Sequence, residues 1–203
     1  MVHLRQSTHS DTLSGQKGPE MVAVIIIVVV VVLLALLLVG SYNGIVRMRN
    51  QVDNGWSQID VQIKRRADLI PNLVETVKGY AAHESGTFEA VVAARNASVS
   101  ANTPSEAAAA EAPMVAALGK IFALAEAYPD LKADANFRQL QSEITATEDR
   151  IAYARQFYND SVTRYHNKID TFPGVAVSKI GSFPHRELFE ADEADRAVPK
   201  VEF

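Results

Sequence analysis

An uninterrupted apolar run from Met21 to Val39 most constrains what this chain can fold into. Its nineteen residues include no charged or hydrogen-bonding side chain. As a helix the run is ~28 Å long, close to the ~30 Å hydrocarbon core of a bilayer. A buried strand rarely exceeds about ten residues, and the apolar part of a signal peptide covers about 7 to 15. The run therefore predicts a retained transmembrane helix over residues 21–40.

The rest of the chain is long enough for one domain with its own core. Beyond the span lie about 160 of the 203 residues, with charges of both signs and a net charge of −4. This balance argues against a nucleic-acid-binding protein, which needs a concentrated basic face. The chain has no cysteine, which excludes disulfides, thiolate metal sites and a cysteine nucleophile.

Apolar residues recur at helical spacing along the remaining sequence, and no strand-like alternation interrupts them. The first stripe, from Ile45 to about Ala81, contains Pro71, where we expect a kink. Helical patterns follow at 85–100, at 104–128 with a possible bend at Pro113, and at 137–172 before Pro173-Gly174. We therefore predict an all-α protein, with an N-terminal transmembrane helix followed by an antiparallel four-helix bundle.

These patterns divide the chain into a tail at 1–20, the span at 21–40, a bundle at 43–172 and a C-terminal tail at 173–203. The glycines of 40–44 either hinge the exit from the membrane or lie within one continuous helix. An up-down-up-down path returns the chain to its starting end, so the C-terminal tail should lie near the membrane. Its aromatics, which include Phe183, Phe189 and Phe203, either dock onto the bundle, touch the lipid interface or stay loose.

Two basic clusters of the first bundle helix are candidate binding residues. Arg47 and Arg49 are ~12 to 15 Å beyond the span and reach lipid headgroups, so we assign them to the membrane interface. Lys64, Arg65 and Arg66 are ~38 Å away, beyond the ~8 Å screening length. We expect these three to form either a solvated face, paired with Asp60 and Asp68, or a partner-binding face.

No motif for chemistry appears. The chain lacks paired Glu-x-x-His motifs, a zincin motif, a G-x-S-x-G elbow and a phosphate-binding glycine loop. His166 fits an ordinary histidine of a helix surface, and Trp56, the only tryptophan, fits interhelical packing. We therefore predict no catalytic, cofactor-binding or metal-binding residues, and expect that the protein is not an enzyme.

Several segments resemble the LemA family of bacterial membrane proteins. The longest is VDNGWSQIDVQIKRRADLIPNLVETVKGYAAHE at 52–84, followed by EAYPDLKADANF at 126–137, TEDRIAYARQFYNDSV at 147–162 and Phe172-Pro173-Gly174. The resemblance implies one N-terminal span, a helical bundle and no assigned enzymatic activity. Gly55 departs from the family, which more often has alanine there, and should weaken the first helix by up to ~1 kcal/mol.

The span, the bundle and the lack of catalytic motifs favour a non-enzymatic scaffold or adaptor at the bacterial cell membrane. Its expected partners are the lipid bilayer and other proteins, with homo-oligomerisation left open and nucleic acid excluded. A sensor that transmits helix movement through 40–44 and Pro71 is the alternative, and a hydrolase is a more distant one. The one apolar span predicts a single-pass protein. The denser lysines and arginines after the span predict that the bundle is cytoplasmic.

Overall fold

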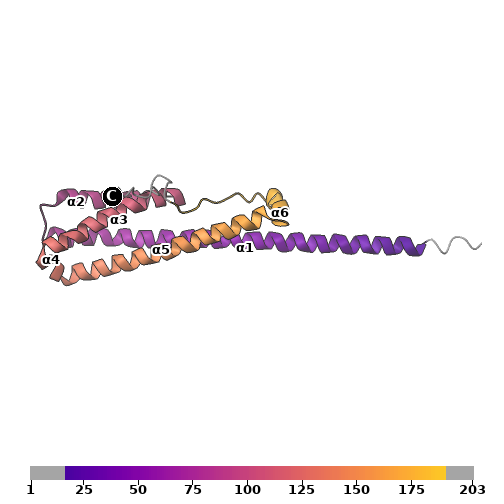
Figure 1. The fold of residues 1–203 in the computed structure, drawn as a ribbon, viewed down its shortest axis with the longest axis horizontal. Helices are drawn as coiled ribbons and strands as arrows, with labels where there is room; N and C mark the ends of the chain where they lie inside the picture. Colours follow the sequence, from indigo (N-terminus) through magenta and orange to yellow (C-terminus); the bar gives the residue numbers. More distant parts are fainter. Residues whose placement is uncertain (1–16, 191–203) are drawn as a thin grey trace, which may run out of the picture.

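A computed structural model of the chain describes residues 17–190, and these residues form six helices and no strand (Figure 1). The prediction of an all-α fold is confirmed. The predicted tails at 1–20 and 173–203 lie partly outside the described residues, as does Phe203. The helices are α1 (Lys17–Lys78), α2 (Ser85–Ser100), α3 (Pro104–Ala127), α4 (Pro129–Ala133), α5 (Ala135–Asp170) and α6 (Gly174–Gly181).

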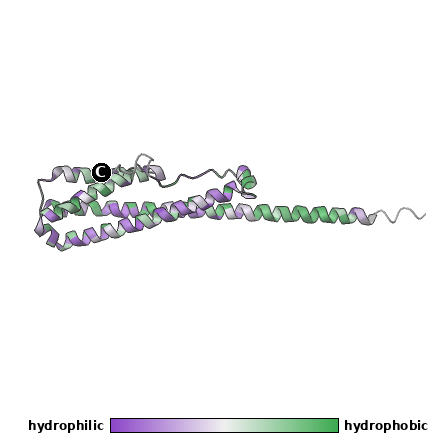
Figure 2. Ribbon diagram, in the orientation of Figure 1, coloured by the Kyte–Doolittle hydropathy of each residue, from purple (hydrophilic) through white to green (hydrophobic). Residues whose placement is uncertain are grey.

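Helix α1 is both the apolar span and the first helix of the bundle. Its 62 residues run without a break through the glycines of 40–44 and through Pro71. At ~1.5 Å per residue such a helix is ~93 Å long. Its apolar N-terminal part projects beyond the bundle, and no other part of residues 17–190 covers it (Figure 2). The span and the bundle therefore share one continuous helix, and the hinge alternative is not adopted.

The chain follows an antiparallel path, but four helices lie together only in the half of the bundle far from the span. Helices α1 and α5 pair along most of the bundle, whereas the shorter α2 and α3 form a hairpin over its distal half (Figure 1). The proximal half, next to the span, is completed by α6 and the extended segment after it. Sequence periodicity predicted the helices but not α4 and α6, which are too short to show a repeat.

The core forms two clusters along the α1–α5 pair. The distal cluster gathers side chains from α1 to α5, including Leu73, Phe88 and Ile121. The proximal cluster joins α1 and α5 to the first turn of α3, to α6 and to the C-terminal segment, and Trp56 packs against it as expected. Helix α3 is also apolar and long enough to span a membrane, but nearly half of its most apolar stretch is buried in the bundle.

Side chains cap the N-termini of α3 and α5. The hydroxyl of Thr103 accepts the Glu106 N–H at 3.2 Å, and the Glu106 carboxylate accepts the Thr103 N–H at 3.3 Å, which forms a capping box. Helix α3 then continues through Pro113. Asp134 caps α5 through the N–H of Phe137 at 2.9 Å.

Gly55 has a packing role that its helix propensity hides. A Cβ atom built at Gly55 would lie 3.2 Å from the Cα of Tyr158 and 3.3 Å from the Phe157 ring. The missing side chain lets the backbones of α1 and α5 approach closely at this crossing. Glycine at position 55 therefore weakens α1 locally, as expected from its helix propensity, but it allows α1 and α5 to pack more closely.

Candidate functional site

An extended segment, residues 182–190, holds the membrane-proximal half of the bundle together, and we call it the strap. It leaves α6 beside the end of the span and runs back along α1 and α5 toward the start of α3 (Figure 1). There the Ser105 hydroxyl donates to the Glu187 carboxylate at 3.1 Å. The tail was expected to lie near the membrane; only its start is beside the end of the apolar span, and it then turns away along the bundle.

Two aromatic side chains anchor the strap in the proximal core. Phe183 and Phe189 are both buried. The Phe183 ring meets the Tyr42 ring edge-on at a centroid distance of 5.5 Å, and the Arg49 guanidinium lies 5.9 Å from its centre. The Arg155 guanidinium lies 4.7 Å from the centre of the Phe189 ring. Of the three alternatives for these aromatics, the structure adopts docking on the bundle.

Tyrosines of α5 bind the strap backbone. The Tyr158 hydroxyl donates to the carbonyl of Glu187 at 2.7 Å, and the Tyr165 hydroxyl donates to that of Pro184 at 2.9 Å. Burial raises the pKa of Tyr158 to about 12 and raises that of Tyr165 as well. Both hydroxyls therefore stay protonated donors across the physiological pH range.

Asn159 makes two further bonds to the strap. Its amide nitrogen donates to the carbonyl of Phe189 at 3.1 Å, and its amide oxygen accepts the Phe189 N–H at 2.8 Å. One side chain thus satisfies both backbone groups of a buried residue, as a neighbouring β-strand would.

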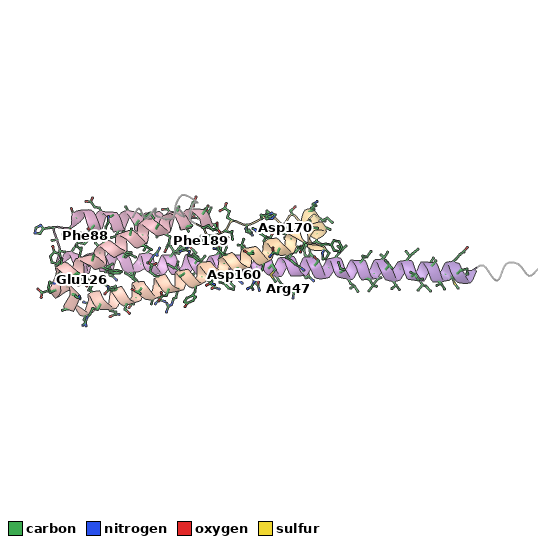
Figure 3. The ribbon with its side chains drawn as sticks, in the orientation of Figure 1. Arg47, Phe88, Glu126, Asp160, Asp170 and Phe189 are labelled. Carbon is green, nitrogen blue, oxygen red and sulfur yellow. The ribbon has the colours of Figure 1, made fainter. Side chains whose placement is uncertain are left out.

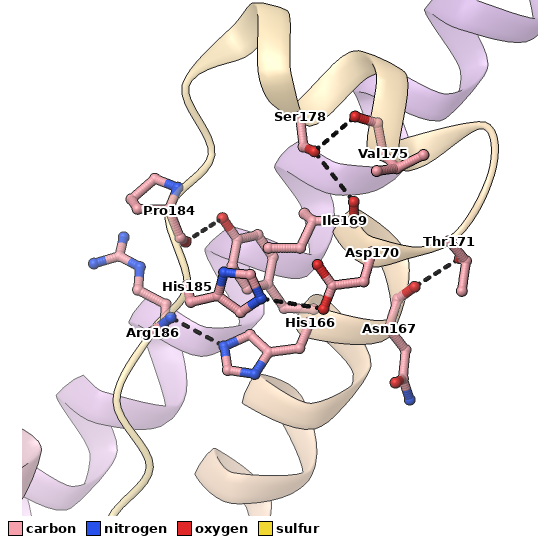
Figure 4. Close-up of polar contacts among 11 residues, drawn as sticks. His166, Asn167, Ile169, Asp170, Thr171, Val175, Ser178, Pro184, His185 and Arg186 are labelled. Carbon is pink, nitrogen blue, oxygen red and sulfur yellow. Dashed lines mark hydrogen bonds and ion pairs between the residues drawn. The ribbon is translucent and has the colours of Figure 1, made fainter.

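His166 receives the strap at its middle (Figure 4). Its Nε2 accepts the Arg186 N–H at 3.0 Å, and its ring lies 4.6 Å from that of His185, which contacts Asp170 at 3.1 Å. The Arg186 side chain pairs with Asp53 of α1 at 3.2 Å. Burial, followed by the neighbouring His185, lowers the pKa of His166. His166 is thus neutral at pH 7 and binds the backbone of the strap, so it is not the ordinary surface histidine that we expected.

The predicted membrane-interface arginines occupy different environments. Arg47 is exposed on α1 near the start of the free apolar stretch (Figure 3), and its Nε donates to the carbonyl of Asn43 at 3.3 Å. Arg49 is half-buried against Phe183. Their contact with headgroups stays a prediction.

The second basic cluster does not share one face. Lys64 is exposed and pairs with Asp60 at 2.7 Å, as expected, and Arg65 is also exposed. Arg66 is only 1% exposed, so the expectation of a solvated or partner-binding face is wrong for this residue. The sequence held a sign of this. The apolar stripe of α1 takes a step of seven residues from Ile63 to Ile70, and Arg66, beside the small Ala67, fills a core position between them.

Arg66 forms a buried ionic triad with Glu111 of α3 and Glu148 of α5. Its two terminal nitrogens donate to the two Glu111 oxygens, each at 2.9 Å, and one also donates to Glu148 at 2.7 Å. Burial alone lowers the pKa of Arg66, but the bonds and charges of Glu111 and Glu148 outweigh it and leave that pKa raised. Burial raises the pKa of Glu148 despite its bond to Arg66. The triad ties three helices together at the boundary of the two core clusters.

A shallow groove between α1 and α5 carries two exposed aromatic side chains. Tyr153, which is 74% exposed, and Phe157 stand one turn apart on α5. The Gln62 side chain across the groove has a buried Oε1 with no hydrogen-bond partner among the described residues. Arg65 follows Gln62 by three residues on the same face of α1. The groove is lined by Gln58, Gln62, Arg150, Tyr153, Ala154 and Phe157.

Within residues 17–190, no group of three or more histidine, aspartate or glutamate side chains is placed to hold a metal ion. The polar groups that lie closest together, in the triad and along the strap, bind one another. The features that define this part of the molecule are thus a lone apolar helix, the bundle that continues it and a strap that closes the bundle at the membrane end.

A helical bundle that continues a candidate membrane span is the class of protein that these features define. The family model described as "LemA family" matches residues 55–203, and the chain belongs to that family. Protein LemA of Metamycoplasma hominis is 30% identical over 78% of this chain and 73% of its own length. Magnetosome protein MamQ of Magnetospirillum gryphiswaldense is 26% identical, and MamQ 1 of Paramagnetospirillum magneticum is 25% identical, each over 88% of this chain and 75% of its own length.

Proposed function

We propose that the protein is a non-enzymatic, single-pass scaffold or adaptor of the bacterial cell membrane. One observation carries the proposal: α1 continues from the span to the far end of the bundle. A partner bound to the bundle is therefore held at a fixed height above the bilayer, because the connection contains no flexible linker. Membership in the LemA family is consistent with this role and assigns no reaction.

The groove with Tyr153 and Phe157 is the surface that best fits a protein partner. Exposed aromatics beside an arginine are the side chains that dominate binding energy at protein interfaces. The arginine that lines this groove is Arg150. Of the partner-binding residues expected from the sequence, Arg65 is exposed one helical turn from Gln62 on α1, while Lys64 is exposed with its charge already paired with Asp60.

Affinity purification of the tagged, full-length protein from detergent extracts tests the proposal. A scaffold retains specific proteins, and the double variant Tyr153→Ser/Phe157→Ser releases them, because the aromatic anchors are lost. Val92→Ser on α2, also an exposed apolar residue, is the matched control and keeps them. Recovery of no protein above background from the wild-type chain refutes the scaffold.

The bundle is proposed to face the cytoplasm. Arg47, Arg49 and Lys64–Arg66 follow the span, and such residues are enriched on the cytoplasmic side of membrane helices. Reporter fusions at each terminus test this orientation: the C-terminal fusion is active only with a cytoplasmic reporter. The sensor alternative requires helix movement at 40–44, and ligand-dependent crosslinking between α1 and α5 would support it over the scaffold.

A further inference from the structure

The two most exposed large apolar side chains of the described residues lie together at the membrane end of the bundle. Ile180, at the end of α6, is 86% exposed, and Phe172, in the turn between α5 and α6, is 79% exposed. Each exceeds every residue of the apolar span itself in exposed fraction. Isolated apolar residues on a surface are ordinary, but two such residues on an eight-residue helix and its entry turn form a patch.

The position of α6 relative to the bilayer follows from its contacts with α1. Tyr42, which touches Phe183 of the strap, is three residues beyond Val39, or ~4.5 Å along the helix axis. Gly44, over which the Lys168 side chain lies, is five residues beyond Val39, or ~7.5 Å along the helix axis. The headgroup layer on each side of a bilayer is about 5 to 7 Å thick. The end of α5 and the start of the strap, which flank α6, are therefore at headgroup level.

Helix α6 has the two-sided character of an interfacial helix. Gly174 and Val177 are buried toward the bundle, while Ala176, Lys179 and Ile180 are exposed. The exposed side thus combines an apolar tip with a lysine. Tyr42 is also half-exposed at this level, where tyrosine is enriched in membrane proteins.

The charge around the patch suits anionic headgroups. Arg47, Lys168 and Lys179 carry positive charge at this end of the bundle and outnumber the nearby carboxylate of Asp170, which contacts His185. Lysine and arginine side chains near an anionic surface are attracted to it. Helix α6 packs on α1 beside the end of the span, so it approaches the bilayer without any change in the bundle.

We propose that Phe172 and α6 form a second membrane contact, which rests in the lipid interface beside the span and fixes the tilt of the bundle. The proposal rests on the proposed membrane anchoring through α1. Phe172 and Ile180 enter the boundary between headgroups and acyl chains, and Lys179 binds anionic headgroups. The strap aromatics Phe183 and Phe189 do not touch lipid, because they hold the bundle.

Fluorescence quenching in reconstituted vesicles tests this contact on the full-length chain. The protein has no cysteine, so Ile180→Cys, Tyr153→Cys and Leu36→Cys each accept one small fluorophore. Vesicles of phosphatidylcholine and phosphatidylglycerol carry nitroxide-labelled lipids, and iodide serves as the quencher from water. Tyr153 is the matched control, because it is also highly exposed in the protein but lies far from α6 on α5.

The label at position 180 is expected to be quenched by nitroxide lipids several-fold more strongly than the label at 153, and to be shielded from iodide. Equal quenching at 180 and 153, with strong quenching at 36, overturns the proposal and leaves the span in the membrane. Weak quenching at 36 instead overturns the membrane anchoring itself. Shielding from iodide at 180 without lipid quenching indicates a second copy of the chain and also overturns the contact. Adding Lys179→Glu to the labelled Ile180→Cys variant is expected to reduce quenching by the nitroxide lipids. An unchanged value excludes binding of Lys179 to anionic headgroups.

Discussion

Replacing Arg66 by methionine tests whether the buried triad organises the bundle. Methionine keeps most of the side-chain volume but leaves Glu111 and Glu148 without their cation. Glu111 is itself buried, and both of its oxygens accept from Arg66 at 2.9 Å. Removing one partner of a buried ionic group costs about 3 to 5 kcal/mol, because the remaining charge has lost its water and its partner.

The expected loss is large enough to measure in the intact protein. For a domain of this size each kcal/mol lowers the melting temperature by about 2 to 4 °C, so a shift of about 6 to 20 °C is expected. Trp56 reports the transition in detergent, since it is the only tryptophan and its ring lies 6.2 Å from that of Tyr158 between α1 and α5. The span, which lacks tryptophan, does not contribute to this signal.

Two comparisons separate the triad from a general effect of charge. Lys64→Met removes an exposed ion pair on the same helix and should cost less than about 1 kcal/mol. The triple variant Arg66→Met/Glu111→Leu/Glu148→Leu should recover most of the lost stability, because no unpaired charge remains. If Arg66→Met melts no lower than Lys64→Met, the triad does not stabilise the bundle.

The loss should also depend on pH. Burial already raises the pKa of Glu148, and without Arg66 the cation that opposes this rise is lost. A raised pKa in the folded state gives stability that is present at low pH and lost as pH rises through that pKa. The deficit of Arg66→Met should therefore be small near pH 4 and grow toward pH 7.

Three further changes test the packing of the bundle and the strap. Gly119→Ala, where a Cβ meets nothing within 4 Å, should stabilise α3 by up to about 1 kcal/mol, whereas Gly55→Ala should gain nothing in chemical denaturation because its Cβ crowds α5. Asn159→Ala leaves both backbone groups of Phe189 unpaired and should cost about 1 to 3 kcal/mol, seen as faster amide exchange at Phe189 but not in α2. The lowered pKa of His166 predicts stability that is full above pH ~6.5 and is lost as pH falls below it, and His166→Gln should flatten the pH dependence of unfolding in that window.

The sequence by itself determined the features that depend on neighbouring residues. The span follows from the length of one apolar run, and the start of α3 after Thr103 follows from the local capping residues there. Periodicity correctly predicted the apolar stripes of α1 and α5, because each stripe faces a partner along its whole length. Family resemblance was also readable, since it is a property of residue order.

Tertiary structure decided what depends on residues distant in the chain. Arg66 belongs to a charged tripeptide in the sequence, yet its partners lie 45 and 82 residues away, and only the fold brings the three charges together. The strap has no period to detect, because its hydrogen bonds go to α5 side chains and not to a regular neighbour. The path of the strap away from the lipid leaves Phe172 and Ile180, not Phe183 and Phe189, exposed at the membrane end. A local pattern shows which residues are apolar. Which of them stay exposed depends on the helices and segments that pack over them in the folded chain.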